Sequence, residues 1–172
     1  DGGTAVYDDA THTLTLRNAT ITRGYNDGDD THGIYAKGDL KLVLNGANTI
    51  QGTDEFHFGV FVEGNLAVCG EGSLNSQGAE YGLFSYDSLT VEGGSITGTA
   101  NGPDGYGICV DKDLTVNGGE VTGTATGERG WGIDTSILTM TGGSVTGKGK
   151  EAAIVTYNEG KQTADKLIVL PE

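Results

Sequence analysis

A tandem repeat is the feature that most constrains this chain. The phrase GICVDKDLTVNGGEVTGTATGERGW, at residues 107–131, recurs with variation on both sides. Five copies follow one another, each 21 to 26 residues long, at 33–58, 59–81, 82–106, 107–131 and 132–152. Repeats of this length, rich in glycine and β-branched residues and lacking a helical period, are typical of a β-solenoid in which each copy forms one coil.

Apolar residues alternate with polar ones inside each copy, which predicts three short strands per coil with one face turned inward. The inward column of the first strand is Ile34, Val60, Leu83, Ile108 and Ile133. That of the second strand is Leu40, Leu66, Leu89, Leu114 and Leu138, and that of the third is Ile50, Leu74, Ile96, Val121 and Val145. A paired glycine such as Gly118-Gly119 predicts a corner with positive φ or close packing.

The expected fold is therefore all-β, a single-stranded right-handed parallel β-helix of about six coils, with the handedness taken from the general preference of parallel crossovers. We expect a single domain over residues 1–172, because a constant period offers no place to divide it. Residues 5–32 are interpreted as a divergent first coil, 33–152 as five clear repeats and 153–172 as a C-terminal coil or cap in which KLIVL covers the last sheet edge. The first-coil alignment pairs Leu14 with Leu114, Leu16 with Val116 and Ile21 with Val121.

The charge of the chain restricts its partners. Its formal net charge is −14, from 24 acidic and 10 basic residues. Such a surface repels phosphate backbones and anionic membranes, so we expect no nucleic-acid partner. No stretch approaches the ~20 apolar residues of a membrane span, and the opening lacks the regions of a signal peptide, so we expect no direct membrane insertion and a mature protein or an excised domain.

The two cysteines are expected to be free thiols. Cys109 falls in the first strand of its coil, whereas Cys69 falls at the end of a second strand two coils away. Stacked coils lie about 4.8 Å apart, so an axial offset of roughly 10 Å exceeds the reach of a disulfide.

Aromatic residues recur at two positions of the repeat. Tyr35, Phe61 and Phe84 are predicted to point outward from the first sheet, one above another, and are the candidate ligand-binding residues. A second column precedes each leading glycine and consists of His32, Phe58, Tyr81, Tyr106 and Trp131. Stacked outward rings form a flat strip against which sugar rings can lie, but such rings also stabilise sheets by cross-strand pairing, and packing at a corner explains the second column equally well.

Acidic loops are the candidate metal sites. Asp27, Asp29 and Asp30 cluster after the first coil, and oxygen ligands on turns are what calcium requires, so calcium is the possible cofactor. The run resembles the first half of an EF-hand loop but lacks its distal Glu. Further acidic residues follow on related loops of later coils, at Asp54, Glu55, Asp104 and Glu128. A solvated, empty turn is the alternative interpretation.

The remaining polar residues are weaker candidates for a functional site. An outward column on the third sheet, predicted as Thr22, Gln51, Asn75, Thr97, Thr122 and Thr146, resembles the hydroxyl ranks of ice-binding solenoids, although Thr is also a common outward strand residue. Asp87, with Asp111 and Asp113, offers paired carboxylates for glycoside hydrolysis, but Asp is usual in such turns. The three histidines fall in different registers, so no catalytic residues are assigned and no enzyme activity is expected.

The phrases GIYAKGDLKLVLNGANTI, YGICVDKDLTVNGGEVTGTA and YDDATHTLTLRNATIT resemble the repeats of right-handed β-helix domains in bacterial surface proteins. The similarity is to large secreted adhesin-like proteins of Firmicutes and to related carbohydrate-binding β-helix proteins, and it covers residues 5–156. It implies an extracellular or cell-surface location, a glycan or host-surface ligand, and further domains in a larger protein. Some proteins of this kind bind acidic polysaccharides with calcium.

The wider superfamily includes pectate lyases and polygalacturonases. This chain has only three arginines and lacks their paired-Asp, His-Gly and Arg-x-Lys motifs. The expected function is thus a non-catalytic domain for adhesion or polysaccharide binding. A structural stalk, a polysaccharide lyase or hydrolase, and an ice-binding protein remain the alternatives.

Overall fold

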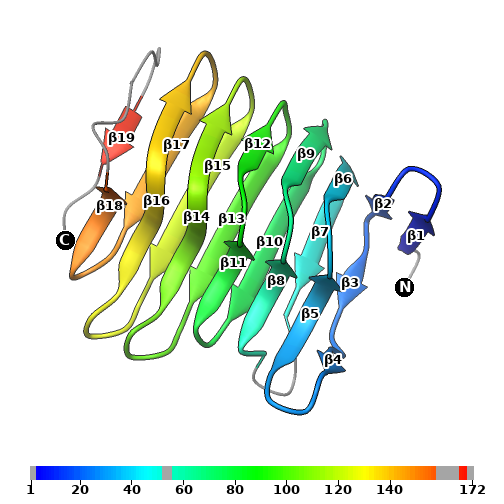
Figure 1. The fold of residues 1–172 in the computed structure, drawn as a ribbon, viewed down its shortest axis with the longest axis horizontal. Coiled ribbons are helices and arrows are strands. Elements are labelled where there is room, and N and C mark those ends of the chain that lie inside the picture. The colour runs from blue at the N-terminus through cyan, green and yellow to red at the C-terminus, as the bar shows by residue number, and fades with distance from the viewer. Residues whose placement is uncertain (1–2, 52–55, 158–166, 170–172) are drawn as a thin grey trace.

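The computed structural model describes residues 3–51, 56–157 and 167–169. The described residues form a β-solenoid of about six turns, in which strands from successive repeats stand side by side along the long axis (Figure 1). The all-β expectation is therefore confirmed. Among these residues there is no helix long and apolar enough to cross a membrane.

The first and second strands of the coils share one twelve-stranded sheet. The first strands are β5 (Thr31–Ala36), β8 (Phe58–Val62), β11 (Tyr81–Ser85), β14 (Tyr106–Val116), β16 (Trp131–Met140) and β18 (Ala152–Thr156). The second strands are β2 (Thr13–Arg17), β6 (Leu40–Asn45), β9 (Leu66–Gly70) and β12 (Leu89–Val91). In the two coils of β14 and β16 the chain stays extended between the first and second strand positions, so one long strand serves both and joins the two columns into one sheet.

The third strands form a separate seven-stranded sheet. These are β3 (Thr20–Ile21), β7 (Ala47–Ile50), β10 (Ser73–Gly78), β13 (Ser95–Ala100), β15 (Glu120–Ala125), β17 (Ser144–Lys148) and β19 (Leu167–Val169). Strand β19 pairs in parallel with β17, so part of the KLIVL segment covers the edge of this sheet, as expected. At the other end β1 (Thr4–Asp8) and β4 (Tyr25–Asn26) pair antiparallel with β2 and β5.

The inward columns form the core. All five first-strand residues predicted to face inward are at most 8% exposed, and all five of the second strand at most 4%. Parallel in-register pairing places each member against its counterpart in the next coil, for example Leu83 against Ile108. Both cysteines are free, which confirms that prediction.

The third-strand column contains one wrong assignment. Leu74 pairs with Asn48, so the column begins at Asn48, whereas Ile50 pairs with Ser76. Asn48 is 2% exposed, and its side chain accepts a hydrogen bond from the Ala19 N–H at 2.9 Å and donates to the Ser73 carbonyl at 3.0 Å. Because both candidates face inward, alternation with period two cannot detect the two-residue slip.

The same slip affects the first coil. Leu14 pairs with Leu42, in the column that continues to Val116, and not in the column of Leu114. Leu16 pairs with Leu44 and Ile21 pairs with Ile50, so the assignments of Leu16 to the column of Val116 and of Ile21 to the column of Val121 are also wrong. The inward face was correct, since a shift of two residues leaves every side chain on its side of the sheet.

Glycines serve two separate structural needs. The second glycine of each pair has positive φ, 80° at Gly94 and 79° at Gly119, as a corner requires. The leading glycine of the repeat instead allows close approach of its main chain to that of the third strand of its coil and of the next coil. A Cβ on Gly107 would lie 2.2 Å from the Thr124 nitrogen and 2.6 Å from the Gly132 oxygen.

We predict that Gly107→Ala destabilises the protein by about 3 kcal/mol, because the backbone atoms it meets can move only by distorting the stacked coils. Urea denaturation measures this. Gly38→Ala is the matched control, since a Cβ there meets nothing within 4 Å. Equal stability of the two variants would contradict the close approach at Gly107.

Candidate aromatic binding face

Two columns of rings run along the outer face of the first-strand column, and together we call them the aromatic ladder. The first consists of the residues just before the leading glycines, His32, Phe58, Tyr81, Tyr106 and Trp131. The second consists of Tyr35, Phe61 and Phe84, with Tyr25 from β4 stacked on Tyr35. The residues of both columns lie on β5, β8 and β11, and those of the first column continue on β14 and β16, strands that stand side by side in Figure 1.

Stacking in the first column is close to parallel. The Tyr81 and Tyr106 ring centroids lie 5.2 Å apart at an interplanar angle of 9°, and those of Tyr106 and Trp131 lie 4.7 Å apart at 10°. This spacing follows from in-register pairing, which places equal positions of adjacent coils about 4.8 Å apart. The rings therefore lie face to face like a stack of plates.

The two columns also contact each other. Phe58 and Phe61 have centroids 5.0 Å apart, as do Tyr81 and Phe84. These partners are three residues apart, and strict alternation would place them on opposite faces. The register skips the leading glycine between them, so the alternation is interrupted there. Both rings consequently reach the same side of the sheet.

The three predicted ligand residues are stacked in register, as the repeat alignment indicated. Centroids of Tyr35 and Phe61 are 5.5 Å apart, and those of Phe61 and Phe84 are 5.3 Å apart. All three are half-buried, so each ring is fixed by its neighbours and still presents part of its surface to solvent. Whether they bind a ligand stays a prediction.

His32 closes the N-terminal end of the first column. It is fully buried, and its ring lies 5.0 Å from that of Tyr35 and 5.1 Å from that of Phe58. Its Nε2 lies 3.1 Å from Asp27 Oδ2, while its Nδ1 has no hydrogen-bond partner. Tyr35 donates a hydrogen bond from its hydroxyl to Glu63, which raises the pKa of Tyr35 to about 12.

Toward the C-terminus the second column no longer consists of aromatic residues. Phe84 pairs with Cys109, and Cys109 pairs with Asp134, so a carboxylate stands where earlier coils carry a ring. Asp134 is only 6% exposed, and the Tyr157 hydroxyl donates to its Oδ2 at 2.7 Å. Burial raises the pKa of Asp134 despite this hydrogen bond.

The Asp134 carboxylate raises the pKa values of neighbouring groups. Partial burial and the charge of Asp134 raise the pKa of Asp111, and burial followed by the same charge raises the pKa of Tyr106. The hydrogen bond to Asp134 is the main reason that the pKa of Tyr157 rises to about 12. The C-terminal end of the ladder is thus an electronegative site beside exposed ring surface.

The calcium candidates occupy one turn, in which the Asp27 and Asp30 carboxylates already have partners. Asp30 Oδ1 lies 3.3 Å from His57 Nδ1 of the next coil. Asp27 Oδ1 accepts hydrogen bonds from the N–H groups of Asp29 and Asp30, at 3.1 and 2.9 Å. The Asp30 N–H, the His32 side chain and the Asp29 N–H, in that order, lower the pKa of Asp27 to about 2.

Within the described ranges no group of three or more His, Cys, Asp or Glu side chains converges on a metal position. Asp54 and Glu55 lie outside those ranges. Calcium binding by Asp27, Asp29 and Asp30 stays a prediction.

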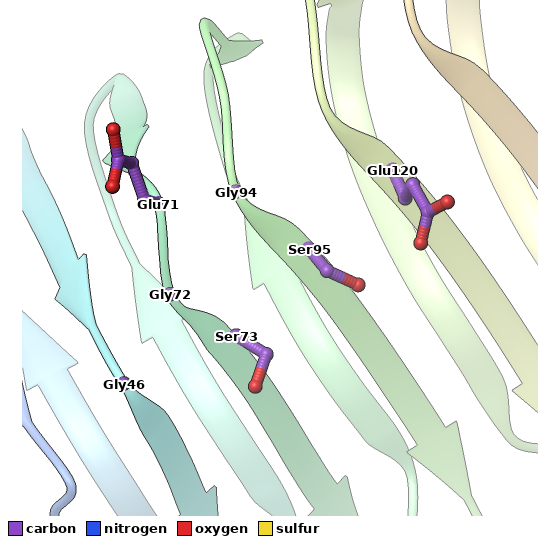
Figure 2. Close-up of a pocket in the computed structure, with 7 residues that line it drawn as sticks. All are labelled: Gly46, Glu71, Gly72, Ser73, Gly94, Ser95 and Glu120. Carbon is purple, nitrogen blue, oxygen red and sulfur yellow. The ribbon is translucent and has the colours of Figure 1, made fainter.

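In the described part of the chain, two grooves are lined by ladder residues and another lies away from the ladder. One of about 300 Å³ is lined by Tyr81 and by the loops at Glu80 and Asp104. Another, of about 480 Å³, opens at the N-terminal end and includes Tyr7 and Tyr35. Figure 2 shows the third, an open trough over the glycine corners of the other sheet, lined by Gly46, Glu71, Gly72, Ser73, Gly94, Ser95 and Glu120. Its lining consists of glycine, serine and glutamate, so it offers no ring against which a ligand can stack.

The threonine column lies on the seven-stranded sheet, with a corrected start. It consists of Thr20, Thr49, Asn75, Thr97, Thr122 and Thr146, so Thr22 and Gln51 do not belong to it. The slip is the one that displaced Ile50. Beside it run Gln77, Thr99, Thr124 and Lys148.

Of the three carboxylates considered for hydrolysis, Asp111 and Asp113 lie on strand β14, and Asp87 lies between β11 and β12. Asp87 forms an ion pair with Lys112, and Asp104 binds Arg129 through two hydrogen bonds of 2.6 and 2.8 Å. These pairs link adjacent coils, one from Asp87 to strand β14 and the other between the loops that hold Asp104 and Arg129. They have the geometry of structural clasps between repeats.

Sequence reasoning did not assign a role to Asp134, Tyr25 or Tyr157. Extending the column of Tyr35 to the last clear repeat, GIDTSILTM, finds Asp134 directly. Tyr25 and Tyr157 lie outside the five clear copies, so no repeat position indicates where they fold.

Comparison with known proteins finds no match, whether with a family model, a curated protein or a solved structure. The function proposed below therefore depends on the geometry of the ladder.

We predict that Asp134→Asn raises the melting temperature more at pH 7 than at pH 3. Burial raises the folded-state pKa of Asp134, so ionisation costs stability, and this cost appears as pH rises through that pKa. Below the usual carboxyl pKa of about 4 both states hold the proton and the cost disappears. Calorimetry at several pH values measures the difference, and a constant difference would contradict a raised pKa.

Proposed function

We propose that this protein is a non-catalytic carbohydrate-binding domain, that the aromatic ladder is its binding platform, and that it serves adhesion. The observation that carries the proposal is the continuous stack of rings on one face, fixed at coil spacing by the fold, in which all rings but the buried His32 and Phe58 are partly exposed. Aromatic rings provide apolar contact area and are already ordered before a ligand arrives, so little side-chain freedom is lost on binding.

The platform suits an elongated ligand. Its rings extend along the solenoid axis, so successive units of a chain-like ligand meet equivalent surfaces on successive coils. Polar groups border the rings, among them Glu63 at one end and Asp111 at the other, and these supply hydrogen-bond partners for sugar hydroxyls. A run of ring contacts bordered by polar groups favours a polysaccharide over a small compact ligand.

The resemblance to bacterial surface repeats supports the wider context of this proposal. In that context the domain is extracellular, is carried by a larger cell-surface protein, and presents the ladder to glycans of a host or another cell. A structural spacer is the competing function, and it requires no ligand at all.

Phe61→Ala should abolish measurable glycan binding while the protein stays folded. Phe61 lies at the centre of the ladder, in contact with Tyr35, Phe58 and Phe84. Removing it interrupts the platform but costs only about 2 kcal/mol of stability, because the ring is half-buried. A panel of plant, mucin and microbial glycans, tested in calcium and in chelator, identifies the ligand, and calorimetry measures the variant.

Thr122→Ala, on the seven-stranded sheet, is the control that should leave affinity unchanged. Unaltered binding by folded Phe61→Ala would remove the ladder from the site. A wild-type protein that binds nothing in the panel would favour the spacer.

A further inference from the structure

The aromatic ladder is asymmetric in charge. Its central part is made of phenylalanine and tyrosine rings, whereas its C-terminal part places Asp134 and Asp111 beside Tyr106 and Trp131. The two carboxylates are close enough for the charge of Asp134 to disfavour ionisation of Asp111. The platform therefore ends in concentrated negative charge.

The basic side chains nearest in sequence to Asp111 and Asp134 form ion pairs with other carboxylates. Lys112 forms its ion pair with Asp87, and Arg129 is bound by both oxygens of Asp104. Among the described residues no ion pair involves Asp111 or Asp134. The net charge of −14 adds to the negative potential of this end.

We propose that this end of the ladder binds the protonated amine of an amino sugar, so that the ligand is a glycan with free, de-N-acetylated amino groups. The inference rests on the proposed glycan-binding function and names its substrate class. Charge complementarity selects this occupant over the others. A uronic-acid polymer carries the same sign of charge as the site, and a neutral glycan leaves the carboxylates without a partner.

Two interactions act together on such an amine. Trp131 is the last ring of the first column, so Tyr106 covers one of its faces and the next coil places the small Ala152 opposite the other. That second face of the partly exposed ring attracts a cation through the ring quadrupole. Asp111 is solvent-exposed at the same end of the sheet and accepts a charge-assisted hydrogen bond from the ammonium group. Asp134, deeper and held by Tyr157, adds its charge from below the ring layer.

The energetic cost of Asp134 supports a functional role. Every neighbouring coil shows that an apolar side chain fits its position, as Phe84 and Cys109 do. A buried carboxylate with a raised pKa costs stability there, and such groups concentrate at functional sites. A bound ammonium group would offset this cost, because its positive charge favours the ionised form of Asp134.

The test compares a β-1,4-linked glucosamine hexamer with its fully N-acetylated counterpart by calorimetry at pH 6.5 and low salt. The two probes share length and linkage and differ in charge. We expect the glucosamine hexamer to bind at least about tenfold more tightly, because one charge-assisted contact contributes a tenfold difference or more.

Charge-matched variants separate a specific site from general attraction between a polycation and an acidic protein. Asp111→Asn with Asp134→Asn should reduce the affinity for the glucosamine hexamer to that for the N-acetylated one. Glu92→Gln with Glu120→Gln removes the same charge away from the ladder and should leave the preference intact. The single Asp111→Asn variant, at an exposed position, tests the site if the double variant fails to fold.

The affinity should also depend on pH with a maximum. Asp134 faces Tyr106, Cys109 and Asp111 from β14 and Tyr157 from beyond β18, and in acid the two carboxylates bind protons and lose their attraction. In base the amine loses its proton and its charge, as a peptide α-amino group does at about pH 8. Affinity should therefore fall on both sides of a neutral optimum.

The outcomes distinguish the two proposals. Equal affinity for the two hexamers, with binding lost in Phe61→Ala, would overturn the amine site and leave the glycan platform standing. Tighter binding of polygalacturonate in calcium than of the glucosamine hexamer would also overturn the amine site. Loss of the preference in the Glu92 and Glu120 double variant would show general charge attraction only, and binding to no glycan would overturn both proposals.

Discussion

In-register parallel stacking of equal repeat positions is the constraint on which the rest of this structure depends. It repeats one side-chain environment along the axis, so a residue that fits in one coil fits in the next. Inside, it produces the aliphatic columns that bury the core, such as Leu83 on Ile108. Outside, it places rings at a spacing that suits stacking, as in Tyr81 on Tyr106. The core and the candidate site are two consequences of one register.

Stacking at this distance restricts the backbone as well. Leading glycines such as Gly107 lie against the third strand of their coil, where a Cβ would collide with main-chain atoms. The same glycines interrupt the alternation and bring two ring columns onto one face. A single residue type thus closes the coil and builds the ladder.

The repeat pattern was sufficient to predict the all-β solenoid, the inward faces and the stacked outer rings, because these depend only on period and alternation. It was not sufficient for register at the N-terminal end. There Asn48 takes a position that later coils fill with an aliphatic residue, and Ile50 two positions on looked equivalent. Asn48 is tolerated because it hydrogen-bonds to backbone across coils, which the sequence does not reveal. The burial of Asp134 under Tyr157 likewise appears only in three dimensions, since Tyr157 lies beyond the clear repeats.

Trp131 offers the most direct test of the central claim, that the outer ladder is a binding face. It is the only tryptophan in the chain, so its emission reports on one place, the acidic end of the first ring column. Titration with the glucosamine hexamer should change that emission and saturate at the stoichiometry found by calorimetry. Saturated binding with an unchanged emission spectrum would place the ligand elsewhere and contradict the account.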